Sequence, residues 1–172
     1  MDKDYGHSGL WETYYEDIGD TWSYVENSLE NIIKRISNER HGSSLIFCYD
    51  REIETEEYIH PESIKIKVPL GTILDSHGDL IKNRPQLLKK YNAFEDLIVS
   101  LSKTDGALIF NDKMELIRAG VIFKVDIRAQ GPGGSRHKSA EAFIEATNSC
   151  GFVISQDGRI TIIEGRFKSK DK

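Results

Sequence analysis

The residues best equipped for chemistry lie in one stretch, from Gly131 to Ala140. It opens with glycine and proline, which a helix interior disfavours. Four polar residues follow: the hydroxyl of Ser135, the cation of Arg136, the imidazole of His137 and the cation of Lys138. From Ala140 onward apolar residues recur at helical spacing. Free N–H groups and the positive end of the helix dipole favour anions at such a helix start. With two cations added, the stretch predicts a phosphate site.

Asp105 is the second candidate, because it stands between a predicted helix and a predicted strand. Gly106 after it lets another group approach closely, and Ala107 begins the apolar strand. A carboxylate in this position can hold a divalent metal or accept a proton from a hydroxyl. Asp-Gly is also a common turn sequence, so a purely structural role is the alternative.

The composition favours a small phosphorylated ligand over a nucleic acid. The chain has 172 residues, enough for one domain with a sizeable core, and a net charge of -5. An acidic protein does not suit a phosphate backbone as partner. The sequence contains no apolar run of 18 residues, so we expect no membrane span. Cys48 and Cys150 are interpreted as buried free thiols rather than a disulfide, which fits a cytoplasmic protein.

Helices and strands must position these candidate residues. Apolar stripes predict a helix from Asp20 to about Asn38 and another over residues 86–101. A third helix follows the glycine-rich loop and is expected to end at Cys150-Gly151. The acidic segment 51–62 is expected to form a surface loop. Strands are predicted at 44–49, 63–68, 107–110, 115–118, 121–127, 152–155 and 160–163.

The order of these elements predicts the fold class. Helices alternate with strands, and two hairpins are expected, the last through Asp157-Gly158. Hairpins are antiparallel, so the sheet must be mixed. The sequence therefore predicts a single α/β domain with a twisted mixed β-sheet flanked by helices.

Two motifs together resemble the diadenylate cyclase domain family, which includes the N-terminal nucleotide-binding domain of DNA-integrity scanning proteins. They are Asp-Gly-Ala at 105–107 and Gly-Ser-Arg-His-Lys-Ser-Ala at 134–140. The family combines Asp-Gly-Ala with a Gly-Thr-Arg-His-Arg-type loop further along the chain. Residues 41–46 also resemble the family's first core strand. We accordingly expect an N-terminal arm and amphipathic helix over 1–40, the diadenylate cyclase-like domain over 41–165, and a charged tail over 166–172.

The resemblance implies an enzyme that condenses two ATP into cyclic di-AMP and two pyrophosphates, with Mg²⁺ or Mn²⁺ required. Two domains would meet face to face, as a homodimer or higher homo-oligomer. Asp105 would bind the metal and activate the ribose 3′-hydroxyl, with Arg136 and His137 as further catalytic residues. The nucleotide-binding residues implied are Gly106, Ala107, Gly134, Ser135, Arg136, His137 and Lys138.

Four positions depart from the family's pattern. Lys138 stands where a second arginine is usual, which keeps the charge but loses bidentate geometry. Ser135 replaces threonine and keeps the hydroxyl, and Thr104 replaces a common histidine. Gln156 stands where many members have a glutamate that could join the metal site. A catalytically weak or inactive nucleotide-binding sensor is therefore the alternative function. A small interaction domain with a purely structural glycine loop is the third reading.

Overall fold

The computed structural model describes residues 22–48, 55–69, 85–112, 114–124, 134–147 and 149–165, and the account below concerns these residues. Among them, no helix is long and apolar enough to cross a membrane. The elements in chain order are α2 (Trp22–Asn38), β1 (Ser43–Phe47), α3 (Thr55–Tyr58), β2 (Ile64–Pro69), α6 (Pro85–Ser102), β3 (Ala107–Phe110), β4 (Glu115–Val121), α7 (Ser135–Thr147), β5 (Cys150–Ile154) and β6 (Ile160–Glu164).

The strands form one six-stranded sheet in the order β2-β4-β3-β1-β5-β6. β1 and β3 are parallel, and every other neighbouring pair is antiparallel. The predicted class, an α/β domain with a mixed sheet flanked by helices, is confirmed. The central strands β1 and β3 are buried along their whole length, as expected for strands covered on both faces.

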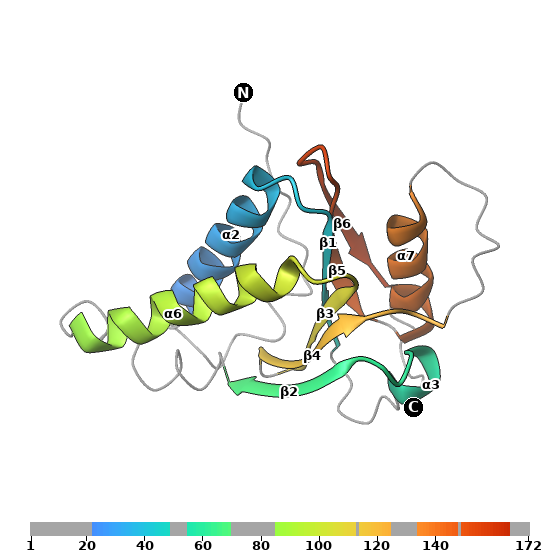
Figure 1. Ribbon diagram of the computed structural model, residues 1–172, viewed down its shortest axis with the longest axis horizontal. Coiled ribbons are helices and arrows are strands. Elements are labelled where there is room, and N and C mark those ends of the chain that lie inside the picture. Colours follow the sequence, from blue (N-terminus) through green and yellow to red (C-terminus); the bar gives the residue numbers. More distant parts are fainter. Residues whose placement is uncertain are drawn as a thin grey trace, which may run out of the picture.

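The helices α2 and α6 cover one face of the sheet (Figure 1). The core on this face includes Ile36 of α2, Ile98 of α6 and Phe47 of β1. Complete burial of such a side chain stabilises the fold by about 1.5–3 kcal/mol. Between the two helices, Ser28 Oγ donates a hydrogen bond to Glu95 Oε1 at 2.9 Å. The stripe that predicted α2 therefore packs into the main core.

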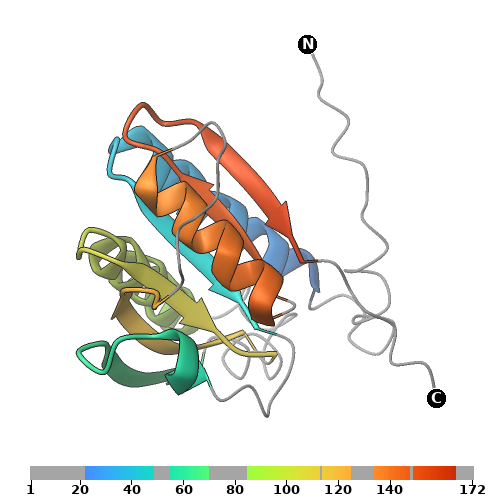
Figure 2. The ribbon, with the colours of Figure 1, turned by 90° about the vertical axis from the view of Figure 1, so that its right-hand side faces the viewer.

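The opposite face is covered by α7 and the short α3. Figure 2 looks onto α7, with β1 and β5 behind it and α2 behind these strands. Because side chains alternate along a strand, Leu45 faces α2 while Ile46 faces α7. Phe143 of α7 anchors this second core and stacks on Phe123 with ring centroids 4.4 Å apart. Two separate cores thus hold the sheet between its helices.

The predicted surface loop at 51–62 is wrong for its described part, because residues 55–58 form α3. The next residue, Ile59, is 2% exposed and forms an isolated antiparallel bridge with Phe123. Tyr58 contacts Phe143 edge to face. A helix of four residues is too short to show a helical period, so its charges suggested a loop.

The predicted separate strand at 121–127 is also wrong in its first part. β4 runs without interruption from Glu115 through Val121, and residues 125–127 lie outside the described part of the chain. Gly120, inside β4, has a φ of +65°, and the pairing with β3 shifts register along this strand. These irregularities break the alternation, and the sequence pattern therefore divides one strand into two.

The third helix ends earlier than predicted, at Thr147, and Cys150 and Gly151 belong to β5. A Cβ at Gly151 would lie 2.7 Å from both the Ile46 Cδ1 and the Leu45 carbonyl oxygen. This glycine therefore serves close packing within the sheet and does not cap the helix.

Both cysteines are buried free thiols, which confirms the sequence interpretation. Burial raises the pKa of Cys48 to about 11, so its thiol stays protonated near neutral pH. Ser149 Oγ donates a hydrogen bond to the Cys48 sulfur at 3.3 Å. Cys48 is therefore a packing residue rather than a nucleophile.

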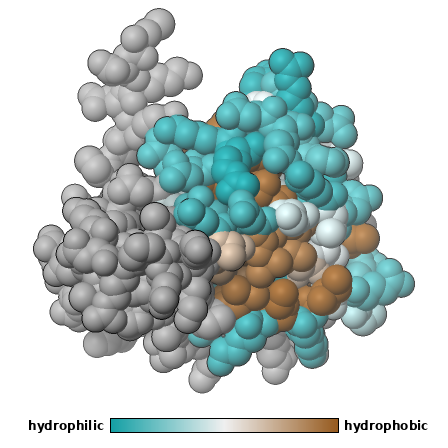
Figure 3. All heavy atoms as spheres, turned by 60° about the vertical axis from the view of Figure 1, so that its left-hand side comes forward, coloured by the Kyte–Doolittle hydropathy of each residue, from teal (hydrophilic) through white to brown (hydrophobic). Residues whose placement is uncertain are grey.

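Some apolar side chains also reach the surface. Figure 3 shows a face on which hydrophobic residues gather in a patch, with hydrophilic residues above and below it. Large apolar side chains at least a third exposed include Leu97 of α6 at 38% and Ile162 of β6 at 50%. Exposed apolar residues are normal on globular proteins, so these positions do not by themselves mark a binding site.

Candidate functional site

The sheet topology brings four chain segments to one edge. Because β1 and β3 are parallel, both begin there, and their antiparallel neighbours β5 and β4 end there. The strand register pairs Ser44 with Ala107 and with Val153, and Ala107 with Val121. Asp105 and Gly106 directly precede this paired row. Residues distant in sequence are thus collected at the edge where a ligand can reach them.

A cavity of about 1020 Å³ opens at this edge, at the upper end of the range typical for small-ligand sites. It brings together most residues of the predicted site, whereas the partly buried Lys138 is not among its described lining residues. The lining residues are Ser44, Asp105, Gly106, Ala107, Val121, Ile122, Phe123, Gly134, Ser135, Arg136, His137, Ser139, Val153, Ile154, Ser155, Gln156, Arg159 and Thr161.

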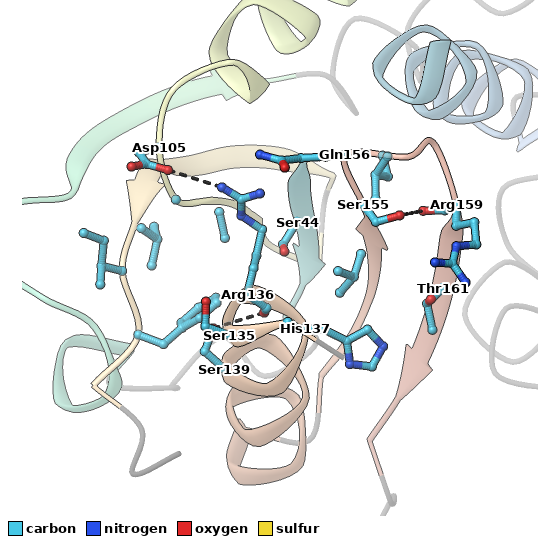
Figure 4. A pocket seen from close by; sticks show the side chains of 18 residues that line it. Ser44, Asp105, Ser135, Arg136, His137, Ser139, Ser155, Gln156, Arg159 and Thr161 are labelled. Atoms are coloured by element: carbon cyan, nitrogen blue, oxygen red, sulfur yellow. Dashed lines mark hydrogen bonds and ion pairs between the residues drawn. The ribbon is translucent and has the colours of Figure 1, made fainter. Parts of the chain in front are cut away.

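An ion pair joins the two sequence motifs across this cavity (Figure 4). Arg136 Nη2 lies 3.2 Å from Asp105 Oδ1, although the residues are 31 positions apart. The Asp105 side chain is 96% exposed and the Arg136 side chain 34% exposed. Exposed pairs of this kind contribute little to stability, about 0–1 kcal/mol. Both groups therefore remain available to an incoming ligand.

Close packing of glycines holds Asp105 in place. Gly106 has a φ of +107°, in the region that favours glycine. A Cβ at this position would lie 2.6 Å from the backbone carbon of Gly120 and 2.7 Å from the Val121 nitrogen. The turn carrying Asp105 therefore rests directly on the end of β4. Any side chain at 106 would push the carboxylate away from the sheet edge.

The first turn of α7 faces the same cavity. The Gly134 carbonyl accepts the Lys138 N–H at 3.2 Å, so the helix begins at Ser135, and it follows the glycine-rich loop as the sequence predicts. Ser139 Oγ donates to the Arg136 carbonyl at 3.0 Å. The N–H groups of the first helical turn have no carbonyl partner within the helix. They add to the positive charge that Arg136 contributes.

His137 lines the cavity on another side of α7. In Figure 4 its ring lies toward Thr161, away from the Arg136–Asp105 pair. Its Nδ1 lies 3.8 Å from Glu141 Oε2, too far for a hydrogen bond. This buried nitrogen has no hydrogen-bond partner among the described residues. The predicted catalytic residues therefore form a close pair plus a separate imidazole.

The turn between β5 and β6 borders the cavity with a second ion pair. Asp157 accepts hydrogen bonds from Ser155 Oγ and, at 2.6 Å, from Arg159 Nε. The Ser155 hydroxyl, with Arg159 as the second cause, lowers the pKa of Asp157 to about 2. The polar side chains of this turn therefore find their hydrogen-bond partners within the turn itself.

The same turn is docked on α2 and carries Gln156. Ser37 Oγ donates to the Gly158 carbonyl at 2.7 Å. Gly158 has a φ of +84°, so glycine suits this position of the turn. Figure 4 shows the Gln156 amide directed toward the side of the cavity where Arg136 lies. A neutral amide therefore stands beside the cationic group.

Several lining residues escaped the sequence prediction, and Ser44 is the most informative. Its side chain is 0% exposed, and its Oγ has no hydrogen-bond partner among the described residues. A buried hydroxyl without a partner costs about 1–3 kcal/mol. A serine within an apolar strand is a weak signal in sequence, since it does not reveal which face it occupies. Arg159 and Thr161 also join the site through the final hairpin.

The described residues offer few ligands for a metal on their own. Among the described residues there is no cluster of three or more histidine, cysteine, aspartate or glutamate side chains that could hold one. Asp105 supplies one exposed carboxylate, and a divalent ion needs about six oxygen ligands. The donor set therefore fits only an ion that also takes oxygens from a bound phosphate chain.

Comparison with known proteins relates this site to a family. The model of a family described as "DisA bacterial checkpoint controller nucleotide-binding" matches residues 30–167. A solved structure of a hypothetical membrane spanning protein from Bacillus cereus is similar, with a TM-score of 0.53 and 16% identity. The comparison covers 90% of this chain and 65% of that one, so the chain spans less than two thirds of that neighbour.

A second similar structure is a double mutant of DacA from Staphylococcus aureus, with a TM-score of 0.52 and 14% identity. It covers 94% of this chain and 88% of that chain. At such identities the two structures show a shared fold. No curated protein matches the sequence.

Proposed function

This chain belongs to the DisA bacterial checkpoint controller nucleotide-binding family, and on that premise we propose that it is a diadenylate cyclase. The reaction condenses two ATP into cyclic di-AMP and two pyrophosphates. The Asp105–Arg136 contact of 3.2 Å at the mouth of a nucleotide-sized cavity carries the proposal. Nucleotidyl transfer depends on exact positioning and on charge neutralisation, which one carboxylate and one cationic helix start can supply.

The start of α7 is the proposed phosphate-binding element. Arg136 would bind phosphate oxygens through its planar guanidinium, and Ser135 would donate its hydroxyl. The free N–H groups of the first turn and the helix dipole would add to this attraction. The exposed ion pair with Asp105 costs little to open, so phosphate oxygens can replace the carboxylate at Arg136.

Asp105 is the proposed acceptor at the attacking hydroxyl. The ribose 3′-oxygen forms a bond to the α-phosphorus of the other nucleotide, the bond to the pyrophosphate oxygen breaks, and Asp105 orients the hydroxyl and takes up its proton. Mg²⁺ or Mn²⁺, held by Asp105 and the phosphates, would neutralise charge on the triphosphate. His137 would meet the nucleotide on the other side of α7 through the exposed part of its ring, since its Nδ1 is buried.

A second copy of the chain is part of the proposal. One cavity holds one nucleotide, yet the product contains two equivalent phosphodiester bonds. A two-fold homodimer, or a higher homo-oligomer containing that contact, gives both bonds the same surroundings. We also propose a cytoplasmic location, because ATP is the substrate and the two thiols are free.

A nucleotide-binding sensor with weak or no turnover is the second candidate. It is favoured by Gln156, which lines the cavity as an amide and so adds no carboxylate for a metal. Lys138 also favours this alternative, because it is not among the described residues that line the cavity. In this alternative the cavity binds ATP or cyclic di-AMP and the bound nucleotide itself is the signal.

One experiment separates these candidates. The purified chain is incubated with ATP and Mn²⁺ at several protein concentrations, and the nucleotides are separated by chromatography. Cyclic di-AMP that forms with the wild type and disappears with Asp105→Asn supports the cyclase. ATP or cyclic di-AMP binding without product favours the sensor. If neither nucleotide changes the melting temperature, both proposals fail and an interaction domain remains.

A further inference from the structure

Gly42, the residue before β1, leaves room for the side chain of Arg136. A Cβ at this position would lie 2.1 Å from Arg136 Nη1 and 3.4 Å from Arg136 Cζ. It would also lie 3.3 Å from Gln156 Cγ. Carbon and nitrogen atoms that are not bonded do not approach to 2.1 Å. A side chain at 42 and the observed position of the guanidinium therefore exclude each other.

Space, rather than backbone conformation, is what this glycine provides. Gly106, Gly120 and Gly158 have positive φ angles, which favour glycine, whereas Gly42 does not. An alanine could adopt the backbone conformation of Gly42 without strain. The bare Cα is needed only because the guanidinium occupies the volume that a methyl group would fill.

The guanidinium is held from two sides. Its Nη2 lies 3.2 Å from Asp105 Oδ1, and its Nη1 rests against Gly42. We call this position, bounded by Gly42, Asp105 and Gln156, the arginine seat. Contacts at both terminal nitrogens give the planar fork a preferred direction before an anion binds. Gly42 directly precedes β1, so the backbone that enters the central strand sets this direction.

We propose that Gly42 is a positioning residue that sets where Arg136 meets the phosphates of the nucleotide. The identity of that ligand rests on the proposed function. Gly42 acts only through Arg136 and makes no contact with the ligand itself. A methyl group here strikes the far end of a flexible side chain, which can move without disturbing the buried core. The substitution Gly42→Ala should therefore impair nucleotide binding while leaving the fold intact.

Ser43→Ala is the matched control, because Ser43 is the next residue, is 0% exposed and does not line the cavity. The probe is 3′-deoxy-ATP with Mg²⁺, which lacks the attacking hydroxyl, with binding followed by calorimetry. We expect Arg136→Ala to weaken binding about 10- to 100-fold, as loss of a charged hydrogen bond does. Gly42→Ala should weaken it about 5- to 10-fold, and Ser43→Ala less than about twofold.

A double-mutant cycle tests whether Gly42 acts through Arg136. In the Arg136→Ala background the space is empty, so Gly42→Ala should cause no further loss of binding. A full additional loss would overturn the proposal. So would a melting temperature of Gly42→Ala more than about 5 °C below that of Ser43→Ala, since the effect would then be on folding.

A measurement without nucleotide keeps this inference separate from the proposed function. The Nε–Hε signal of Arg136, identified by its absence in Arg136→Ala, is followed by NMR. It should move in Gly42→Ala and stay unchanged in Ser43→Ala. If the wild type does not bind 3′-deoxy-ATP, the proposed function fails, and the NMR signal alone then tests whether Gly42 positions Arg136. An unmoved signal in Gly42→Ala overturns the role of Gly42.

Discussion

Two aspartate–arginine pairs border the same cavity, and they differ in how their charges are satisfied. Asp157 and Arg159 are two residues apart, meet at 2.6 Å and share the turn with Ser155. Asp105 and Arg136 are 31 residues apart and meet at 3.2 Å, with the Asp105 side chain 96% exposed. The first pair is saturated by its neighbours, and the second is open.

This difference distinguishes a pair that stabilises a turn from a pair that can react with a ligand. A carboxylate with several short hydrogen bonds has little left to offer a ligand, which the depressed pKa of Asp157 reflects. A carboxylate with one long contact to a cation can exchange that contact for a hydroxyl or a metal. The same two residue types therefore hold a turn in one place and form a candidate active site in the other.

The largest expected effect contrasts the two aspartates. Asp105→Asn should lower cyclic di-AMP formation at least about 100-fold, because it removes the group that orients and deprotonates the hydroxyl. Asp157→Asn should change the rate less than about threefold. Both are measured by chromatography of product from ATP and Mn²⁺. Comparable losses in the two variants would remove the distinction drawn between the pairs.

The arginines give the next contrast. Arg136→Ala should weaken ATP binding about 10- to 100-fold, since a charged hydrogen bond to phosphate is lost. Arg159 also lines the cavity, but its Nε is already engaged by Asp157. Arg159→Ala should therefore weaken binding less than about threefold. Titration calorimetry at fixed ionic strength compares the two. A larger loss of ATP affinity in Arg159→Ala than in Arg136→Ala would indicate that the phosphates bind near Arg159, and it would contradict the proposed site at the start of α7.

Ser44 extends the comparison to a polar group with no internal partner among the described residues. We expect its buried hydroxyl to bond the nucleotide, so Ser44→Ala should weaken ATP binding about 5-fold without lowering the melting temperature. Ser43 Oγ is also buried without a partner among the described residues, but Ser43 does not line the cavity, so Ser43→Ala should change neither quantity. Calorimetry and thermal unfolding provide both readouts. A destabilised Ser44→Ala with normal binding would show that the hydroxyl serves folding alone.

The smallest effect concerns pH and the saturated pair. The pKa of Asp157 is lowered from 3.8 to about 2, so the unfolded chain binds more protons between these values. Stability from this group is therefore complete above pH 3.8 and is lost as the pH falls through about 2. The free energy of unfolding, measured by urea titration between pH 5 and pH 2, should decrease less steeply with falling pH for Asp157→Asn than for the wild type. Identical slopes would contradict the lowered pKa.

Local features of the site were predictable because they depend on neighbouring residues. The presence of a helix after the glycine-rich loop follows from glycines before a helical pattern, and the final hairpin follows from Asp157-Gly158. The mixed sheet follows from combining hairpins with helices. The pairing of Asp157 with Arg159 is local in the same sense. The segment containing α3, the division of β4 and the end of α7 were missed because tertiary contacts override short patterns there.

By itself, the sequence determined which groups are present: a carboxylate beside two small residues, a cationic helix start, and two motifs of a nucleotide-binding family. Only the tertiary structure decided how these groups meet. The parallel pairing of β1 with β3 brings Asp105 to the edge where α7 begins. The missing side chain of Gly42 lets Arg136 reach that carboxylate, and Lys138 is left outside the described lining. The spacing of residues along the sequence does not predict which of these groups lie close together, because their distances depend on strand register and packing.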